Sequence, residues 1–258
     1  MTGLRAERLL DGRVLELRLC APPKNLLDRA CLVAITEELG ALRLDEDPDR
    51  HLCAILLSAE GNNFSVGASV AEHTPAEAPA MLQAFYGAVR ALLDPSLPIV
   101  AAVQGHCLGA GLELASLALR VVMQARARLG QPEIKLAALA PIASVVLPRR
   151  IGQARAEELL LSGRTVDAAE ALRIGLCDEV TIGDPREVAL SWLAEHLCGL
   201  SASALRQACK AARRVLEEDL EVVLPQVDDC YQDLLRTHDC AEGVAAFLEK
   251  RSPAWSDA

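Results

Sequence analysis

The sequence predicts an α/β fold that ends in a helical extension. Apolar runs typical of strands alternate with helical patterns over residues 1–183, as in folds whose strands are joined by crossover helices. From Asp184 onward no strand-like run remains, and apolar residues recur at spacings of three and four through Phe247. The 258 residues are 52% hydrophobic, which is enough for one substantial core. We therefore expect an α/β core over 1–183 and a helical C-terminal region over 184–258.

A β-hairpin is expected at the start of the chain. Leu4–Leu10 and Arg13–Leu19 alternate apolar and polar residues around Asp11-Gly12, a dipeptide that favours tight hairpin turns. Asp28 then follows as a candidate N-cap for an amphipathic helix that continues to about Leu44.

The rest of the core repeats the alternation of helix and strand. Buried strands are predicted from short apolar runs, and helices from longer amphipathic stretches. The predicted strands are Leu52–Leu57, Leu97–Val103, Ala118–Ala125 and Leu176–Val180; a helix is predicted over Ala76–Leu93, and Ile142–Arg173 should be largely helical.

Composition excludes several classes of protein. A net charge of −10 and only 3% aromatic residues argue against nucleic-acid binding, which needs a basic face or stacking platforms. No segment has the pattern of a signal peptide, and no apolar run approaches transmembrane length. The nine cysteines include no CxxC pair, and the five histidines show no metal-ligand spacing. We expect a cytoplasmic protein with a small-molecule partner, no membrane partner and no metal.

The most informative stretch runs from Gln104 to Ala115. A buried strand leads into small residues and then into strong helix formers, so a helix should begin there with free N–H groups and a positive dipole end. Glu113 stands between two leucines, which predicts a buried carboxylate with a partner or a raised pKa. It is a candidate acid or base; the alternative is a helix packed tightly through its glycines, with Glu113 in a surface salt bridge.

Two further segments have features that a plain scaffold does not require. Gly67-Ala68 follows a predicted strand and lets backbone approach a ligand closely, although an ordinary loop explains it too. Glu133 follows a proline in a loop, where a solvated acid is the simple alternative. If Glu113 and Glu133 met in one pocket, they could hold a water molecule and pass protons in both directions.

These motifs together resemble the crotonase (enoyl-CoA hydratase/isomerase) superfamily. The resemblance extends over almost the whole chain, and the two glutamates lie 20 residues apart, as in the hydratases of that family. The ordered segments are Phe64-Ser-Val-Gly-Ala68, Gly105-His-Cys-Leu-Gly-Ala-Gly-Leu-Glu113-Leu-Ala, Gln131-Pro-Glu133-Ile and Leu147-Pro-Arg-Arg-Ile-Gly152. The resemblance implies a crotonase-like superhelix of ββα units, a C-terminal region involved in trimerisation, and a homotrimer or homohexamer.

The resemblance also implies roles for individual residues. The N–H groups of Ala68 and Ala110 would form an oxyanion hole for a CoA thioester carbonyl, with Glu113 activating water and Glu133 delivering the proton. Most relatives have glycine where this chain has Ala110, and the added methyl requires a negative φ. No cofactor is expected beyond the coenzyme A of the substrate; the residues implied in binding it are Lys24, Leu26, Ser65, Val66 and Lys250.

The family hosts several reactions, so the fold alone does not give the activity. Retention of both glutamates favours hydration. The segments 64–75 and 135–148 resemble the subgroup that adds water, in a 1,4-addition, to cyclohexa-1,5-diene-1-carbonyl-CoA in anaerobic benzoate degradation. The product would be 6-hydroxycyclohex-1-ene-1-carbonyl-CoA. The alternatives are a general enoyl-CoA hydratase, an acyl-CoA thioester hydrolase, and a silent subunit that binds CoA esters.

Overall fold

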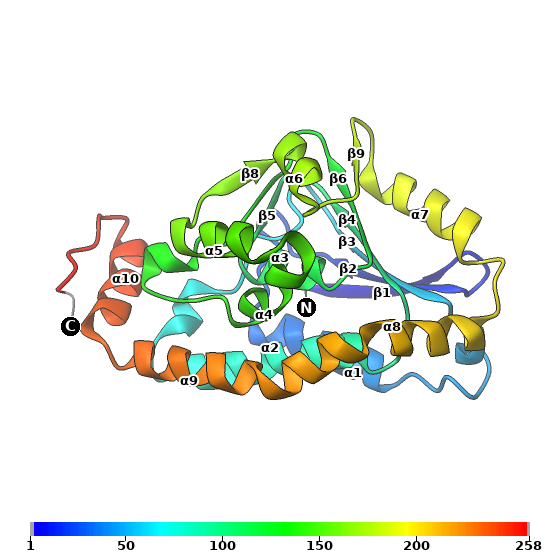
Figure 1. The fold of residues 1–258 in the computed structure, drawn as a ribbon, viewed down its shortest axis with the longest axis horizontal. Helices are drawn as coiled ribbons and strands as arrows, with labels where there is room; N and C mark the ends of the chain where they lie inside the picture. The colour runs from blue at the N-terminus through cyan, green and yellow to red at the C-terminus, as the bar shows by residue number, and fades with distance from the viewer. Residues whose placement is uncertain (1–2, 257–258) are drawn as a thin grey trace.

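The computed structural model describes residues 3–256 and contains two sheets (Figure 1). The main sheet has the strand order β1-β2-β3-β4-β6-β9, in which only β1 and β2 pair antiparallel. Its strands are β1 (Leu4–Leu9), β2 (Val14–Leu19), β3 (Ala54–Ala59), β4 (Ile99–Val103), β6 (Arg120–Gln124) and β9 (Glu179–Thr181). The predicted α/β class is therefore confirmed.

The predicted hairpin is present, with Leu4 opposite Leu19 and Leu9 opposite Val14. Its turn begins one residue earlier than expected, because Leu10 already has a positive φ of 52° and Asp11 follows with 55°. Gly12 completes the turn at a φ of 79°, where glycine carries no steric penalty.

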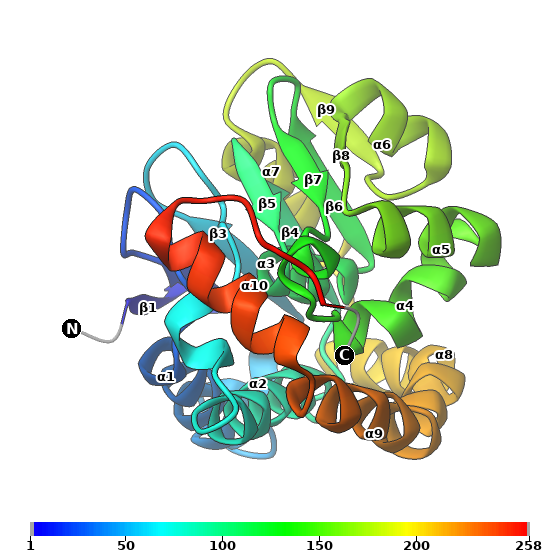
Figure 2. The same ribbon diagram turned by 90° about the vertical axis from the view of Figure 1, so that its left-hand side faces the viewer.

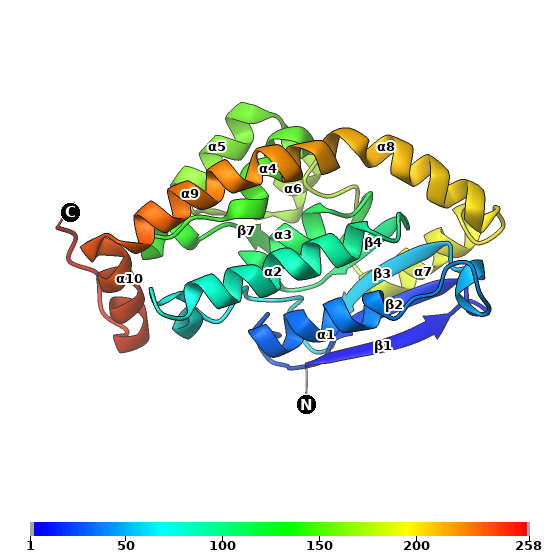
Figure 3. The same ribbon diagram turned by 90° about the horizontal axis from the view of Figure 1, so that it is seen from below.

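The main sheet is buried on both faces, which explains why its parallel strands read as continuous apolar runs. On one face Leu15, Leu17 and Ile55 pack beneath two helices, α1 (Arg29–Gly40) and α2 (Ala78–Leu93), which lie side by side in Figure 3. On the other face the alternate residues pack against α7 (Pro185–His196). Both layers are needed to bury the strands.

Helix α1 begins as predicted and ends sooner than predicted. The Asp28 side chain accepts a hydrogen bond from the backbone N–H of Cys31 at 2.9 Å and caps the first turn. The helix stops at Gly40 because the next residues turn toward the buried Asp49, whose carboxylate accepts from the N–H of Arg43 at 2.6 Å.

The smaller sheet was not predicted. It has the order β5-β7-β8 and consists of β5 (His106–Leu108), β7 (Arg128–Gly130) and β8 (Thr165–Asp167), shown together in Figure 2. Three residues are too few for the period-2 pattern that identifies a strand in sequence. This sheet carries the segment that leads into the helix of Glu113.

Short helices fill the space between the two sheets and the C-terminal helices. They are α3 (Ala110–Ser116), α4 (Pro141–Ile151), α5 (Gln153–Ser162) and α6 (Ala168–Ile174), with single 3₁₀ turns η1 (Asp49–His51), η2 (Val70–His73) and η3 (Glu133–Leu136). The largely helical character expected for 142–173 is confirmed, apart from β8.

The C-terminal region is helical, as predicted. After α7 come α8 (Ala202–Val222), α9 (Leu224–Leu235) and α10 (His238–Glu249). Helices α8 and α9 run end to end along one side of the molecule, and α10 folds back across η2 and η3 (Figures 1 and 2). The approach is close, because a Cβ atom on Gly243 would lie 2.2 Å from the Leu136 carbonyl oxygen. Helix α10 thus holds η3, the turn that carries Glu133.

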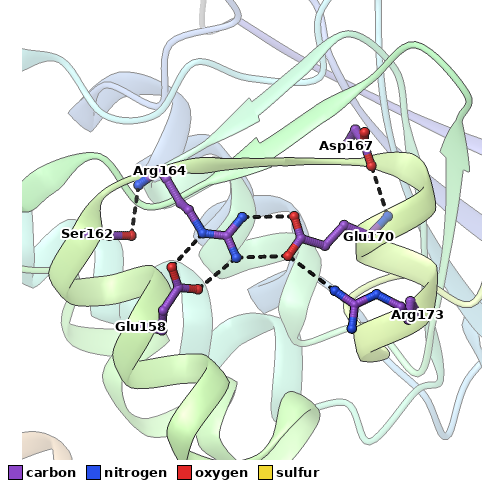
Figure 4. Close-up of polar contacts among 6 residues, drawn as sticks. All are labelled: Glu158, Ser162, Arg164, Asp167, Glu170 and Arg173. Carbon is purple, nitrogen blue, oxygen red and sulfur yellow. Dashed lines mark hydrogen bonds and ion pairs between the residues drawn. The ribbon is translucent and has the colours of Figure 1, made fainter.

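An ion-pair cluster joins α5 to α6 through the segment that precedes β8 (Figure 4). Arg164 lies between Glu158 of α5, at 2.6 Å, and Glu170 of α6, at 2.8 Å. The preceding residue, Gly163, packs on Ile134 of η3, where a Cβ atom would come within 2.9 Å of Ile134 Cγ2. Exposed pairs of this kind contribute little stability one at a time, so we assign the cluster to positioning α5, β8 and α6 relative to one another.

Over residues 3–256, no helix combines the length and the apolar character needed to cross a membrane.

Candidate active site

A cavity of about 440 Å³ opens between the small sheet, α2, η3 and the C-terminal helices. This volume suits a small-molecule ligand. Residues far apart in the sequence share its wall: Lys24, Val66, Gly67, Ala68, Val70, His73, Met81, Leu82, Phe85, Leu108, Gly109, Ala110, Glu113, Pro132, Glu133, Lys135, Leu136, Leu139, Pro141, Tyr231 and Phe247. The wall is mostly apolar and contains both predicted glutamates.

Glu113 is buried in the first turn of α3 and only 3% exposed, as its leucine neighbours predicted. Its Oε1 accepts a hydrogen bond from the backbone N–H of Ala143 at 2.8 Å. Ala143 lies in the first turn of α4, where N–H groups have no acceptor within the helix and the dipole is positive. Burial raises the pKa of Glu113 to a greater extent than the N–H groups of Ala143 and Ile142 lower it.

Glu133 begins η3 and lies on the same cavity wall, half-buried. With its amide in the orientation that satisfies its hydrogen bonds, Gln131 donates Nε2 to the two Glu133 carboxylate oxygens at 3.1 and 3.3 Å. Gly109 makes room for this carboxylate, since a Cβ atom there would lie 2.4 Å from Glu133 Oε1. The structure therefore brings Glu133 against the start of α3.

The two carboxylates influence each other. The pKa of Glu133 is raised first by burial and then by the charge of Glu113. Two acids that repel each other in a water-poor site titrate as a pair, and one proton is shared between them over a range of pH. The N–H of Ala143 stabilises the charged form of Glu113, and the Gln131 amide stabilises that of Glu133, yet burial raises both pKa values above the ordinary value.

Two backbone N–H groups on the cavity wall are free to bind an oxygen. Within residues 3–256, neither the Ala68 N–H nor the Ala110 N–H donates a hydrogen bond to the protein. Each follows a glycine with positive φ, +100° at Gly67 and +54° at Gly109, a backbone region that favours glycine. Ala110 itself is the first residue of α3, so its methyl is accommodated in helical backbone.

Hydrogen bonds hold these two segments beside each other. Leu108 donates its N–H to the Ser65 carbonyl at 2.9 Å, and Ser65 donates to the His106 carbonyl at 3.1 Å. The Ser65 side chain is fully buried and accepts from the Gly67 N–H at 3.1 Å. Gly111 allows the contact, because a Cβ atom there would lie 2.7 Å from Ser65 Cβ.

The structure places two of the five residues predicted to bind CoA on the cavity wall. Lys24 and Val66 line the cavity, whereas Leu26, Ser65 and Lys250 are not part of its lining. Ser65 lies behind the wall and packs the loops together, and Lys250 is exposed at the C-cap of α10. A role of any of these five residues in CoA binding stays a prediction.

Sequence reasoning missed several wall residues. Lys135 adds a second positive charge to the lining, besides that of Lys24, and Gln131, which is not part of the lining, is the hydrogen-bond partner of the Glu133 carboxylate. His73 on η2 is buried, and its Nδ1 lies 2.9 Å from the Ser69 carbonyl. Tyr231 of α9 and Phe247 of α10 close the cavity from the C-terminal region. For these residues, the only signal in the sequence was that Gln131 lies two positions before Glu133.

Comparisons of the sequence and the fold with known proteins identify the family of this chain. The enoyl-CoA hydratase/isomerase family matches residues 11–258. The chain is 46% identical, over 96% of its length and 94% of the relative's, to a cyclohexa-1,5-dienecarbonyl-CoA hydratase of Thauera aromatica. It is 34% identical to the 2,3-dehydroadipyl-CoA hydratase of Escherichia coli, covering 93% and 94% of the two chains. The structure of EchA1_1 from Mycobacterium paratuberculosis superposes with a TM-score of 0.86 at 28% identity, covering both chains completely.

The chain belongs to the enoyl-CoA hydratase/isomerase family. It is a carbon–oxygen lyase with the crotonase fold, and the resemblance inferred from its motifs is confirmed.

The raised pKa of Glu133 predicts how stability depends on pH. Above the ordinary carboxyl pKa of 4.5, the folded protein retains a proton that the unfolded chain has released, so stability falls as pH rises toward the raised pKa. Each pKa unit of elevation costs about 1.4 kcal/mol. Glu133→Gln removes this loss. Between pH 5 and pH 8, the free energy of unfolding measured in urea should therefore fall less for the variant than for the wild type.

Glu38→Gln, at an exposed position of α1, is the matched control and should follow the wild type at both pH values. An equal pH dependence in the wild type and Glu133→Gln would contradict the assigned environment of Glu133.

Proposed function

We propose that this protein hydrates cyclohexa-1,5-diene-1-carbonyl-CoA by 1,4-addition. The observation that carries the proposal is the pair Glu113 and Glu133 on one cavity wall with the free N–H groups of Ala68 and Ala110. The 46% identity to the hydratase of Thauera aromatica supports the choice of a cyclic dienoyl ester. The product is 6-hydroxycyclohex-1-ene-1-carbonyl-CoA.

The reaction begins with the thioester carbonyl between the two N–H groups. Glu113, whose charged form is stabilised by Ala143, takes a proton from water while the water oxygen bonds to the β-carbon of the ring. Electrons move through the diene onto the thioester oxygen, where the N–H groups of Ala68 and Ala110 stabilise the enolate. A single donor of this type contributes about 3 kcal/mol to the transition state.

The second step returns a proton to carbon. Glu133 carries the shared proton and delivers it to the far end of the diene, as the enolate electrons move back to form the remaining double bond. One water is consumed, one C–O and one C–H bond form, and the proton on Glu113 passes back to Glu133 before the next turnover. The pair therefore begins and ends each cycle with one proton.

The cavity also suits the rest of the substrate. Lys24 and Lys135 place positive charge on its wall, where a CoA phosphate would be attracted. The ring would lie against the apolar side chains of Met81, Leu82 and Leu139. A homotrimer or homohexamer and a cytoplasmic location remain predictions from the sequence.

Glu113→Gln and Glu133→Gln should each lower kcat by about 10²-fold or more, because the amide keeps the shape of the side chain and cannot exchange a proton. Steady-state hydration rates measure this, with Glu38→Gln as the control that keeps full activity. Unfolding curves and solution mass confirm that each variant folds. A near wild-type rate in either glutamine variant would remove that glutamate from the mechanism.

The substrate is tested by offering cyclohexa-1,5-diene-1-carbonyl-CoA, cyclohex-1-ene-1-carbonyl-CoA and crotonyl-CoA to the purified protein. Loss of the absorbance of the conjugated thioester should give the highest kcat/KM with the cyclic diene. Preference for crotonyl-CoA would identify a general enoyl-CoA hydratase, and release of free CoA thiol would identify a thioester hydrolase.

A further inference from the structure

Tyr231 lines the cavity, and its hydroxyl is a buried polar group that the mechanism above does not use. Tyr231 lies on α9, is 2% exposed and lines the cavity. Within residues 3–256, its hydroxyl has no hydrogen-bond partner. Buried hydroxyls are normally paired, and one left alone is destabilising unless a water or a ligand completes it.

A carboxylate on the same helix, that of Asp228, already accepts a hydrogen bond from another tyrosine. Asp228 lies one turn before Tyr231 on α9 and accepts a hydrogen bond from the Tyr86 hydroxyl of α2 at 2.9 Å. These are the only two tyrosines of the sequence. Tyr86 is paired and is not part of the cavity lining, whereas Tyr231 is unpaired and lines the cavity.

Within the described residues, the side chains around Tyr231 offer its hydroxyl no hydrogen-bond partner, so a ligand is the partner to consider. Its ring packs in an apolar cluster with Met81, Leu82, Leu235 and Cys240. Burial is the main reason that its pKa is raised, and the charges of Glu133 and Glu113 raise the pKa further. The side chain is thus a neutral hydrogen-bond donor within the electrostatic reach of both glutamates.

We infer that the Tyr231 hydroxyl donates a hydrogen bond to the oxygen that the enzyme adds to the acyl group. This inference rests on the proposed hydration. The oxygen arrives as water at the two carboxylates and leaves as the hydroxyl of the product, so it keeps lone pairs for a donor throughout. Tyr231 would therefore favour a hydroxyacyl ester over the same ester without the hydroxyl.

The test compares ligands that differ only in that hydroxyl. Binding is measured by calorimetry in the Glu113→Gln background, in which turnover is blocked, with 6-hydroxycyclohex-1-ene-1-carbonyl-CoA and cyclohex-1-ene-1-carbonyl-CoA. Adding Tyr231→Phe should weaken binding of the hydroxylated ester about 5- to 10-fold. Binding of the ester without the hydroxyl should change less than about twofold. Tyr86→Phe is the matched control, because it removes the other tyrosine hydroxyl and should leave the ratio of the two affinities unchanged.

A second ligand pair separates this inference from the choice of substrate. The same measurements are made with 3-hydroxybutanoyl-CoA and butanoyl-CoA. If only this linear pair binds and Tyr231→Phe still weakens the hydroxylated member selectively, the ring substrate is wrong and the role of Tyr231 stands. An equal effect of Tyr231→Phe on both members of each pair, or no effect, overturns the inference and indicates a hydroxyl satisfied by a structural water. Failure of all four esters to bind overturns both the inference and the proposed function.

Discussion

The site depends on one electrostatic constraint: two carboxylates, one buried and one half-buried, share a cavity wall that is mostly apolar. Ionising both is costly, because burial penalises each charge and each charge repels the other. The backbone N–H groups of Ala143 and Ile142 at the start of α4 stabilise the charge of Glu113, whereas the charge of Glu113 raises the pKa of Glu133. In the proposed hydration, this asymmetry makes Glu113 the base and Glu133 the carrier of the proton.

Much of the surrounding structure maintains that constraint. The N-terminus of α4 is directed at Glu113, whereas Gln131, Gly109 and η3 fix the position of Glu133. Helix α10 packs closely on η3 through Gly243 at Leu136, and Gly163 packs on it at Ile134. The two glycine turns that expose the N–H groups of Ala68 and Ala110 are joined by hydrogen bonds through Ser65. The free N–H groups of Ala68 and Ala110 and the two carboxylates therefore belong to one connected wall.

Local sequence was sufficient for the elements with strong periodicity and for the burial of Glu113. The hairpin, α1 with its Asp28 cap and the apolar strands all follow from short-range patterns. The small sheet escaped prediction because each strand has three residues, and the end of α1 depended on the distant Asp49. Two further features depend on residues far apart in the sequence and have no local signal. They are the hydrogen bond from Ala143 to Glu113 and the position of Tyr231 on the cavity wall. The convergence of Glu113 and Glu133 likewise required the fold.

The coupling of the two glutamates can be measured by carbon-13 NMR titration of the Glu133 side-chain carboxyl in the wild type and in Glu113→Gln. The account predicts that the pKa of Glu133 falls in the variant, because the repelling charge is gone. It should nevertheless remain above the ordinary value of 4.5, because burial persists. An unchanged pKa of Glu133 would contradict the coupling on which the mechanism rests.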